Sequence, residues 1–147
     1  MASNPRAFAG EIAVGEEREA LVVENLTRTQ IVQYAGASGD FNPIHHDEPF
    51  ATKTAGYPSV FAHGMLTMGL TGRLLTDWLG DGVLRSFGVR FVRQVWPGDT
   101  LTARGRVVAV EDHPSGCLAT IEVATRNQNG EEVVAGTAKA LLPRRGA

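Results

Sequence analysis

Cysteine is almost absent from this chain of 147 residues. The single cysteine, Cys117, excludes an intramolecular disulfide and leaves no thiol cluster for a metal. Long apolar runs are also missing, so no segment is predicted to span a bilayer. We accordingly do not expect a membrane to be a binding partner. Residues 1–10 lack the apolar core of a signal peptide, and we therefore expect a cytoplasmic protein.

Strong charge of either sign is missing as well. The formal net charge of −2 at pH 7 argues against nucleic acid as the main partner. A hydrophobic content of 43% and a charged content of 20% are typical of a globular protein, and the length predicts one domain over residues 1–147. Ten basic and eight acidic residues lie in residues 73–147. This mild excess suits a phosphate-bearing ligand or an acidic carrier protein, and solvated strand faces are the alternative explanation.

What the chain does contain is a short turn with two ionisable side chains. Asp40 and His45 lie five positions apart, with Asn42-Pro43 between them. Proline lacks an amide proton and disfavours the helical basin for the preceding residue, so we expect a rigid, non-helical turn. An acid–base pair on such a turn can hold a water or a substrate hydroxyl. A purely structural polar turn is the alternative.

A second unusual element, Ala62-His63-Gly64-Met65, begins a strongly apolar segment. We predict one long helix from Gly64 to Leu79. Because its apolar residues cover most of its circumference, we expect it to be buried nearly all round. These residues are Met65, Leu66, Met68, Leu70, Leu74, Leu75, Trp78 and Leu79.

The remaining pattern predicts short helices in the first half and strands in the second. Thr27 and Gln30 have the spacing of a capping box, and Asp47 is placed to cap a short helix to about Thr54. Alternating apolar positions and hairpin turns predict an antiparallel sheet, which must curl around the long helix because each needs the other's apolar face. The predicted strands are Ala20–Glu24, Val83–Arg93, Thr100–Val110, Cys117–Asn127 and Val133–Leu142. The predicted fold class is therefore α+β.

These motifs together resemble the MaoC-like dehydratase family, also called hydratase 2 or (R)-specific enoyl hydratase. The resemblance rests on Tyr34-Ala35-Gly36, on the run from Ser38 to Asp47, on Ala51 and on His63-Gly64-Met65. It implies a single hot-dog domain that acts on (3R)-hydroxyacyl and trans-2-enoyl thioesters of CoA or an acyl carrier protein. It also implies a homodimer or heterodimer whose sheets join edge to edge. Residues 34–78 resemble in particular the β subunit of mycobacterial (3R)-hydroxyacyl-carrier-protein dehydratases.

Reversible hydration and dehydration of such thioesters, a hydro-lyase reaction, needs one base and one acid near adjacent carbons. Asp40 and His45 supply that pair, with His45 favoured as the base at C2. By resemblance, the Gly64 amide donates to the thioester oxygen, which fits the positive end of a helix. We predict no cofactor and no bound metal.

Three further residues are weaker candidates for substrate binding or positioning. Asn42 more naturally holds the turn through backbone bonds, and His63 has a minor direct role at most. By the same resemblance, Thr71 lies where some members of the family place a serine near the site, and it is a candidate substitute for that serine. Two alternative functions are a hot-dog thioesterase and a non-catalytic acyl-binding subunit. The five-residue spacing of the pair favours the hydratase over the thioesterase, and the presence of both residues argues against the non-catalytic subunit.

Overall fold

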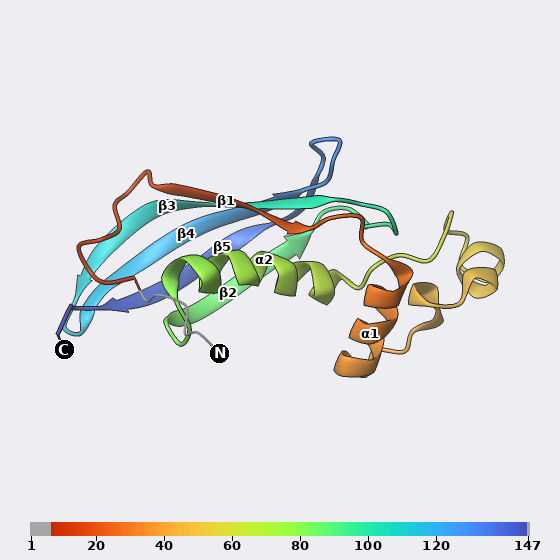
Figure 1. Cartoon of the computed structure of the whole chain (residues 1–147), viewed down its shortest axis with the longest axis horizontal. Helices are drawn as coiled ribbons and strands as arrows, with labels where there is room; N and C mark the ends of the chain where they lie inside the picture. The colour runs from red at the N-terminus through yellow and green to blue at the C-terminus, as the bar shows by residue number, and fades with distance from the viewer. Residues whose placement is uncertain (1–6, 147) are drawn as a thin grey trace.

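A computed structural model describes residues 7–146. Five strands form one antiparallel sheet in the order β1-β3-β4-β5-β2, so that β1 and β2 are its edges (Figure 1). The strands are β1 (Glu17–Val23), β2 (Leu84–Phe91), β3 (Leu101–His113), β4 (Gly116–Arg126) and β5 (Glu132–Pro143). Each predicted strand is confirmed, with ends that differ by a few residues.

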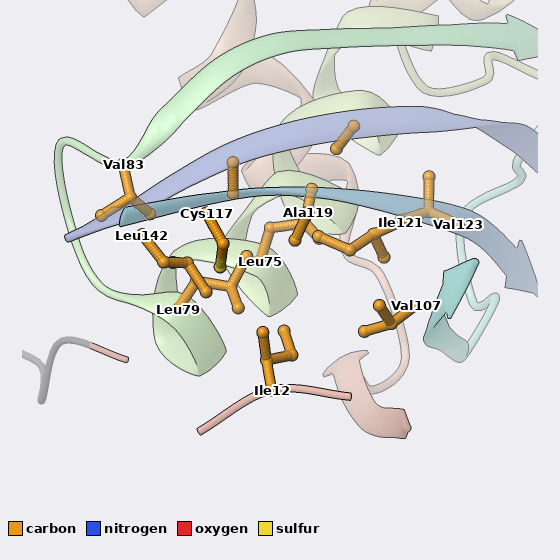
Figure 2. Packing of buried hydrophobic residues seen from close by; sticks show 12 residues of the cluster. Ile12, Leu75, Leu79, Val83, Val107, Cys117, Ala119, Ile121, Val123 and Leu142 are labelled. Carbon is orange, nitrogen blue, oxygen red and sulfur yellow. The ribbon is translucent and has the colours of Figure 1, made fainter. Parts of the chain in front are cut away.

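The long helix α2 (Gly64–Leu79) begins and ends at the predicted residues. It lies along one face of the curved sheet and contacts all five strands (Figure 1). Alternation along each strand explains the core, because Leu101, Ala103 and Val107 of β3 are fully buried while Arg104 and Arg106 point outward. Figure 2 shows how Leu75 and Leu79 of the helix meet the inward residues of the strands. The labelled members of this cluster are Ile12, Leu75, Leu79, Val83, Val107, Cys117, Ala119, Ile121, Val123 and Leu142.

The expectation that α2 is buried nearly all round is wrong. Met65, Gly69, Arg73 and Asp77 recur every fourth residue and form an exposed stripe. The physical reason is that the sheet covers only one side of the helix, so the residues one turn apart on the opposite side face outward. Among the described residues, no helix has both the length and the apolar character needed to cross a membrane.

The segment between β1 and α2 forms an extension beyond the start of α2 (Figure 1). It contains α1 (Arg28–Ser38), the 3₁₀ turn η1 (Pro43–His45) and the π-helical turn η2 (Phe50–Thr54). The predicted capping box is confirmed, since Thr27 accepts from the Gln30 amide and Gln30 accepts from the Thr27 amide.

The turn between Asp40 and His45, predicted to be non-helical, differs from that prediction in one respect. Pro43 begins a single 3₁₀ turn, which proline tolerates at a first helical position because no amide is needed there. The predicted short helix after Asp47 is confirmed in place, with the Asp47 carboxylate accepting from the Phe50 amide at 3.1 Å. Its hydrogen bonding from Phe50 onward is of the π type.

Candidate active site

Two segments meet at the start of α2 and bring together Asp40, His45 and His63. A carboxylate oxygen of Asp40, a ring nitrogen of His45 and a ring nitrogen of His63 all lie within 4.8 Å of one another. Asp40 is exposed, whereas His45 and His63 are buried. The structure therefore places the two predicted catalytic residues side by side and adds His63 to them.

Local hydrogen bonds orient the Asp40 carboxylate. Gly39 ends α1 in the left-handed region with φ of 75°, which turns the chain sharply before Asp40. One carboxylate oxygen of Asp40 accepts from the Asn42 amide at 3.2 Å, and the Asn42 side chain accepts from the Ile44 amide at 3.2 Å. These successive turns leave the second carboxylate oxygen of Asp40 available to a substrate.

A backbone carbonyl sets the tautomer of His45. Its Nδ1 lies 2.7 Å from the Phe61 carbonyl oxygen, so Nδ1 carries the proton and donates it. Nε2 then holds the lone pair in the neutral ring. Burial lowers the pKa of His45, and the neighbouring His63 and His46 lower it further, while the Phe61 carbonyl and Asp40 act in the opposite direction. A neutral imidazole with a lone pair at Nε2 is a competent general base.

His63 lies directly against this ring. The two imidazoles are stacked, with centroids 3.8 Å apart and planes inclined by 26°. His63 Nε2 donates to the Asp40 carbonyl oxygen at 3.0 Å. Its Nδ1 is buried and has no hydrogen-bond partner among the described residues. The Tyr34 ring packs on His63 in a T-shaped arrangement, with ring centroids 4.9 Å apart and planes inclined by 60°.

Gly64, the first residue of α2, opens onto a pocket of about 260 Å³. The first amides of a helix have no acceptor within it and lie at its positive end, so they can bind a developing negative charge. The Phe91 ring lies so close that a Cβ at position 64 would be 2.9 Å from it. Asp40 and His45 do not line this pocket. Its lining consists of Phe61, Ala62, Gly64, Thr67, Phe91, Val92, Arg93, Gln94, Val95, Val133 and Val134.

The other predicted residues have structural partners. Asn42 caps η1, as expected for a residue that holds the turn. Thr71 is fully buried, and its hydroxyl bonds the Thr67 carbonyl and lies 2.6 Å from the Thr125 hydroxyl of β4. Sequence reasoning missed Phe61 and Phe91, because neither belongs to a local motif. They reach the site only when the chain folds.

Asp40, His45 and His63 also have the side-chain types that bind divalent transition metals. An imidazole binds a metal in its ring plane, at about 2.1 Å from nitrogen. Because the His45 and His63 rings are stacked with planes inclined by only 26°, one ion cannot easily lie in the plane of both rings. This geometry fits proton transfer better than metal coordination.

Comparison with known proteins places this arrangement in a family. The family described as MaoC like domain matches residues 10–133. The chain belongs to the MaoC-like family. It is 33% identical over 138 residues to the (R)-specific enoyl-CoA hydratase of Aeromonas caviae, covering 92% of this chain and 98% of that protein. A solved structure of the (R)-hydratase from A. caviae matches with a TM-score of 0.80 and 31% identity, covering 92% of this chain and 100% of that chain.

Two mycobacterial relatives extend the match. The β subunit of the 3-oxo-4,17-pregnadiene-20-carboxyl-CoA hydratase of Mycobacterium tuberculosis is 37% identical over 108 residues, covering 73% of this chain and 80% of that subunit. The 3-hydroxyacyl-thioester dehydratase Y of the same organism is 47% identical over 68 residues, covering 44% of this chain and 23% of that protein. The predicted family, the hot-dog fold and the enzyme class are thereby confirmed: this is a MaoC-like enzyme of the hydratase and dehydratase type.

Proposed function

We propose that this MaoC-like enzyme adds water to trans-2-enoyl thioesters to form (3R)-hydroxyacyl thioesters, and catalyses the reverse elimination, with Asp40 and His45 as its acid–base pair. One observation carries the proposal. A carboxylate oxygen of Asp40 and a ring nitrogen of His45 lie within 4.8 Å of each other near the start of α2, and the first residue of this helix is Gly64. A carboxylate, an imidazole lone pair and an unpaired amide are the three groups that the reaction needs.

In the elimination direction, His45 removes a proton from C2, and the imidazolium so formed gives this proton to the C3 hydroxyl, which leaves as water when the C3–O bond breaks. Hydration is the reverse: His45 takes a proton from water as the water oxygen bonds to C3, and then delivers that proton to C2. The free Nε2 lone pair and the lowered pKa of His45 support its role as the base at C2. The Asp40 carboxylate then orients the water or the C3 hydroxyl.

Both directions pass through an enolate whose charge lies on the thioester oxygen. The Gly64 amide is the donor we assign to that oxygen, because it lies at the positive end of α2 and opens onto the pocket. A side chain at position 64 would meet the Phe91 ring, so glycine is the residue that lets this ring lie against the start of α2 at the edge of the pocket. The apolar pocket lining suits an acyl chain.

We propose CoA as the thiol carrier, since two relatives are named as CoA hydratases. One of these is named as a β subunit, which supports a related hot-dog chain as a partner and leaves a homodimer as the alternative assembly.

The deciding experiment incubates the purified protein with crotonyl-CoA. We expect the enoyl absorbance to fall without release of free thiol, and chiral analysis to identify the (3R)-hydroxy product. Release of free thiol would instead indicate a thioesterase. If the protein binds crotonyl-CoA but shows neither reaction, alone or with a candidate partner subunit, the proposal is rejected in favour of an acyl-binding subunit.

A further inference from the structure

The most unusual buried group outside the proposed acid–base pair is the imidazole of His63. It is 2% exposed, yet only one of its two ring nitrogens has a partner among the described residues. Buried polar atoms in native proteins are nearly always hydrogen-bonded, and an exception calls for an explanation. A residue needed only to fill this space would be less costly as an apolar side chain.

The contacts of His63 are directed at both members of the pair. Its Nε2–H group donates to the carbonyl oxygen of Asp40, which lies on the same residue as the carboxylate. The face of its ring packs on the face of the His45 ring. His63 also precedes Gly64 directly and acts as the N-terminal cap residue of α2, without a side-chain capping bond of its own.

His63 therefore contacts or adjoins three parts of the site, namely Asp40, His45 and Gly64. A different element of the fold holds each of them in place. Asp40 follows the end of α1, the His45 ring donates a hydrogen bond to the Phe61 carbonyl, and the Gly64 amide belongs to α2. If the turn from Asp40 to His45 moved relative to the helix by about 1 Å, a reaction could lose about a hundredfold in rate.

We propose that His63 is a positioning residue: its Nε2–H bond to the Asp40 carbonyl and its stacking on His45 hold the acid–base pair in register with the Gly64 amide. This inference rests on the proposed function and adds to it the group that aligns the pair. His63 does not exchange a proton with the substrate in this scheme. Its Nδ1 has no partner among the described residues because the ring is oriented to aim Nε2 at the Asp40 carbonyl.

Two variants separate positioning from space filling. His63→Gln keeps an amide N–H at about the place of Nε2, whereas His63→Phe keeps a ring that can stack but loses the donor. If His63 only filled space, the apolar ring of His63→Phe would preserve both stability and activity better than the polar amide of His63→Gln. If the bond to the Asp40 carbonyl positions the pair, the order of activity is the reverse.

The expected result is that His63→Phe loses about a hundredfold in kcat while its KM and thermal unfolding temperature stay close to those of the wild type. His63→Gln keeps at least about a tenth of the wild-type kcat. His113→Gln, which changes a histidine in the hairpin at the opposite end of the sheet, is the control and keeps full activity (Figure 1). If His63→Phe does not fold, His63→Met replaces it as a flexible side chain without an N–H donor.

A second experiment, which does not depend on turnover, measures the protonation of the His45 ring by NMR titration. The groups that face this ring are Asp40, His46 and His63, together with the Phe61 carbonyl. Because His63 lowers the pKa of His45, both substitutions at position 63 are expected to move the His45 titration to higher pH. We also expect His63→Phe, but not His63→Gln, to change the chemical shifts of Asp40.

The outcomes are distinct. Wild-type kcat in His63→Phe, or a higher kcat in His63→Phe than in His63→Gln, overturns the positioning role. Unchanged shifts at Asp40 and an unchanged His45 titration in both variants overturn it as well, even if the wild type proves inactive on crotonyl-CoA. Inactivity of the wild type with the expected NMR changes rejects only the proposed function.

Discussion

Three histidines pin the loop that carries the proposed catalytic residues, and each does so by donating to a backbone carbonyl. His45 donates to Phe61, His63 to Asp40, and the exposed His46 to the Phe41 carbonyl oxygen at 3.1 Å. An imidazole keeps a donating N–H group in both its neutral and its charged form. The loop geometry can therefore persist while His45 gains and loses a proton during the reaction.

Removing either member of the pair tests the assignment at the scale of single residues. We expect Asp40→Asn and His45→Ala each to lower turnover of crotonyl-CoA by about a hundredfold or more, because a positioned acid or base contributes that much. Steady-state kinetics on folded protein measures the loss. Asp112→Asn, in the distant β3–β4 hairpin, is the matched control. Near-wild-type turnover in either folded site variant would reject the pair.

The lowered pKa of His45 predicts the acidic side of the pH profile. The neutral ring is the active base, so kcat/KM is expected to stay level through neutral pH and to fall only as the pH drops below the ordinary histidine value. In that same window the unfolded chain binds a proton that the folded site resists, so the free energy of unfolding also falls as the pH is lowered. Kinetics and thermal unfolding between about pH 5 and 8 check both trends. Activity that rises on acidification would contradict a neutral base.

Gly64→Val tests the proposed amide donor. A Cβ there would lie 2.9 Å from the Phe91 ring, and the larger valine side chain would occupy the approach to the amide. We expect activity to fall by about a hundredfold or more, with little loss of stability, since Phe91 is half-exposed and its ring can move. Gly69→Ala on the exposed stripe of α2 is the control, because its added Cβ meets nothing within 4 Å. A folded and active Gly64→Val variant would place the enolate donor elsewhere.

At the scale of elements, the close pairing of β2 with β5 depends on glycine. Gly136 of β5 pairs with Val89, and a Cβ on it would lie 2.1 Å from the Gly88 carbonyl oxygen. Backbone atoms cannot yield as a flexible side chain can. This contact fixes how tightly the edge strand β2, which carries Phe91 to the start of α2, joins the sheet.

Gly136→Ala is therefore expected to destabilise the protein by about 1–3 kcal/mol, as over-packing of a tight contact does. Chemical denaturation measures the change in the free energy of unfolding. The contrasting variant is Gly36→Ala in α1, where an added Cβ meets nothing within 4 Å. That substitution replaces a helical glycine and is expected to stabilise by about 0.5–1 kcal/mol. Equal effects of the two substitutions would show that the strand contact does not limit stability.

At the scale of the whole molecule, the sheet formed by residues 7–146 ends in the edge strands β1 and β2, and no further strand of this described part pairs with either. Phe91 and Val92, at the end of β2, are 49% and 50% exposed, and Met65 at the start of α2 is 55% exposed. Natural proteins cover or pair such edges. These exposed apolar residues lie beside Gly64 at the start of α2, so a second hot-dog chain packed there would cover this end of the helix.

We expect a dimer in solution, formed with a second copy or with a related subunit. Light scattering after size exclusion, with and without a candidate partner, measures the particle mass over a range of concentrations. Activity is expected to decline on dilution in step with the dimer fraction. A monomer that is fully active at assay concentration would contradict this assembly.

Local structure could be predicted from the sequence, whereas the completion of the site depends on contacts between distant elements. The cap at Thr27, the turn around Pro43 and the helix from Gly64 were predictable, because capping, proline and apolar periodicity act over a few residues. The proximity of Asp40 and His45 was predictable for the same reason, because the two residues are only five positions apart in the sequence. The stacking of His63 on His45, the carbonyl of Phe61 and the ring of Phe91 against Gly64 were not predictable. Those contacts join separate elements, and their geometry depends on strand register and helix docking, which the packing of the whole core sets.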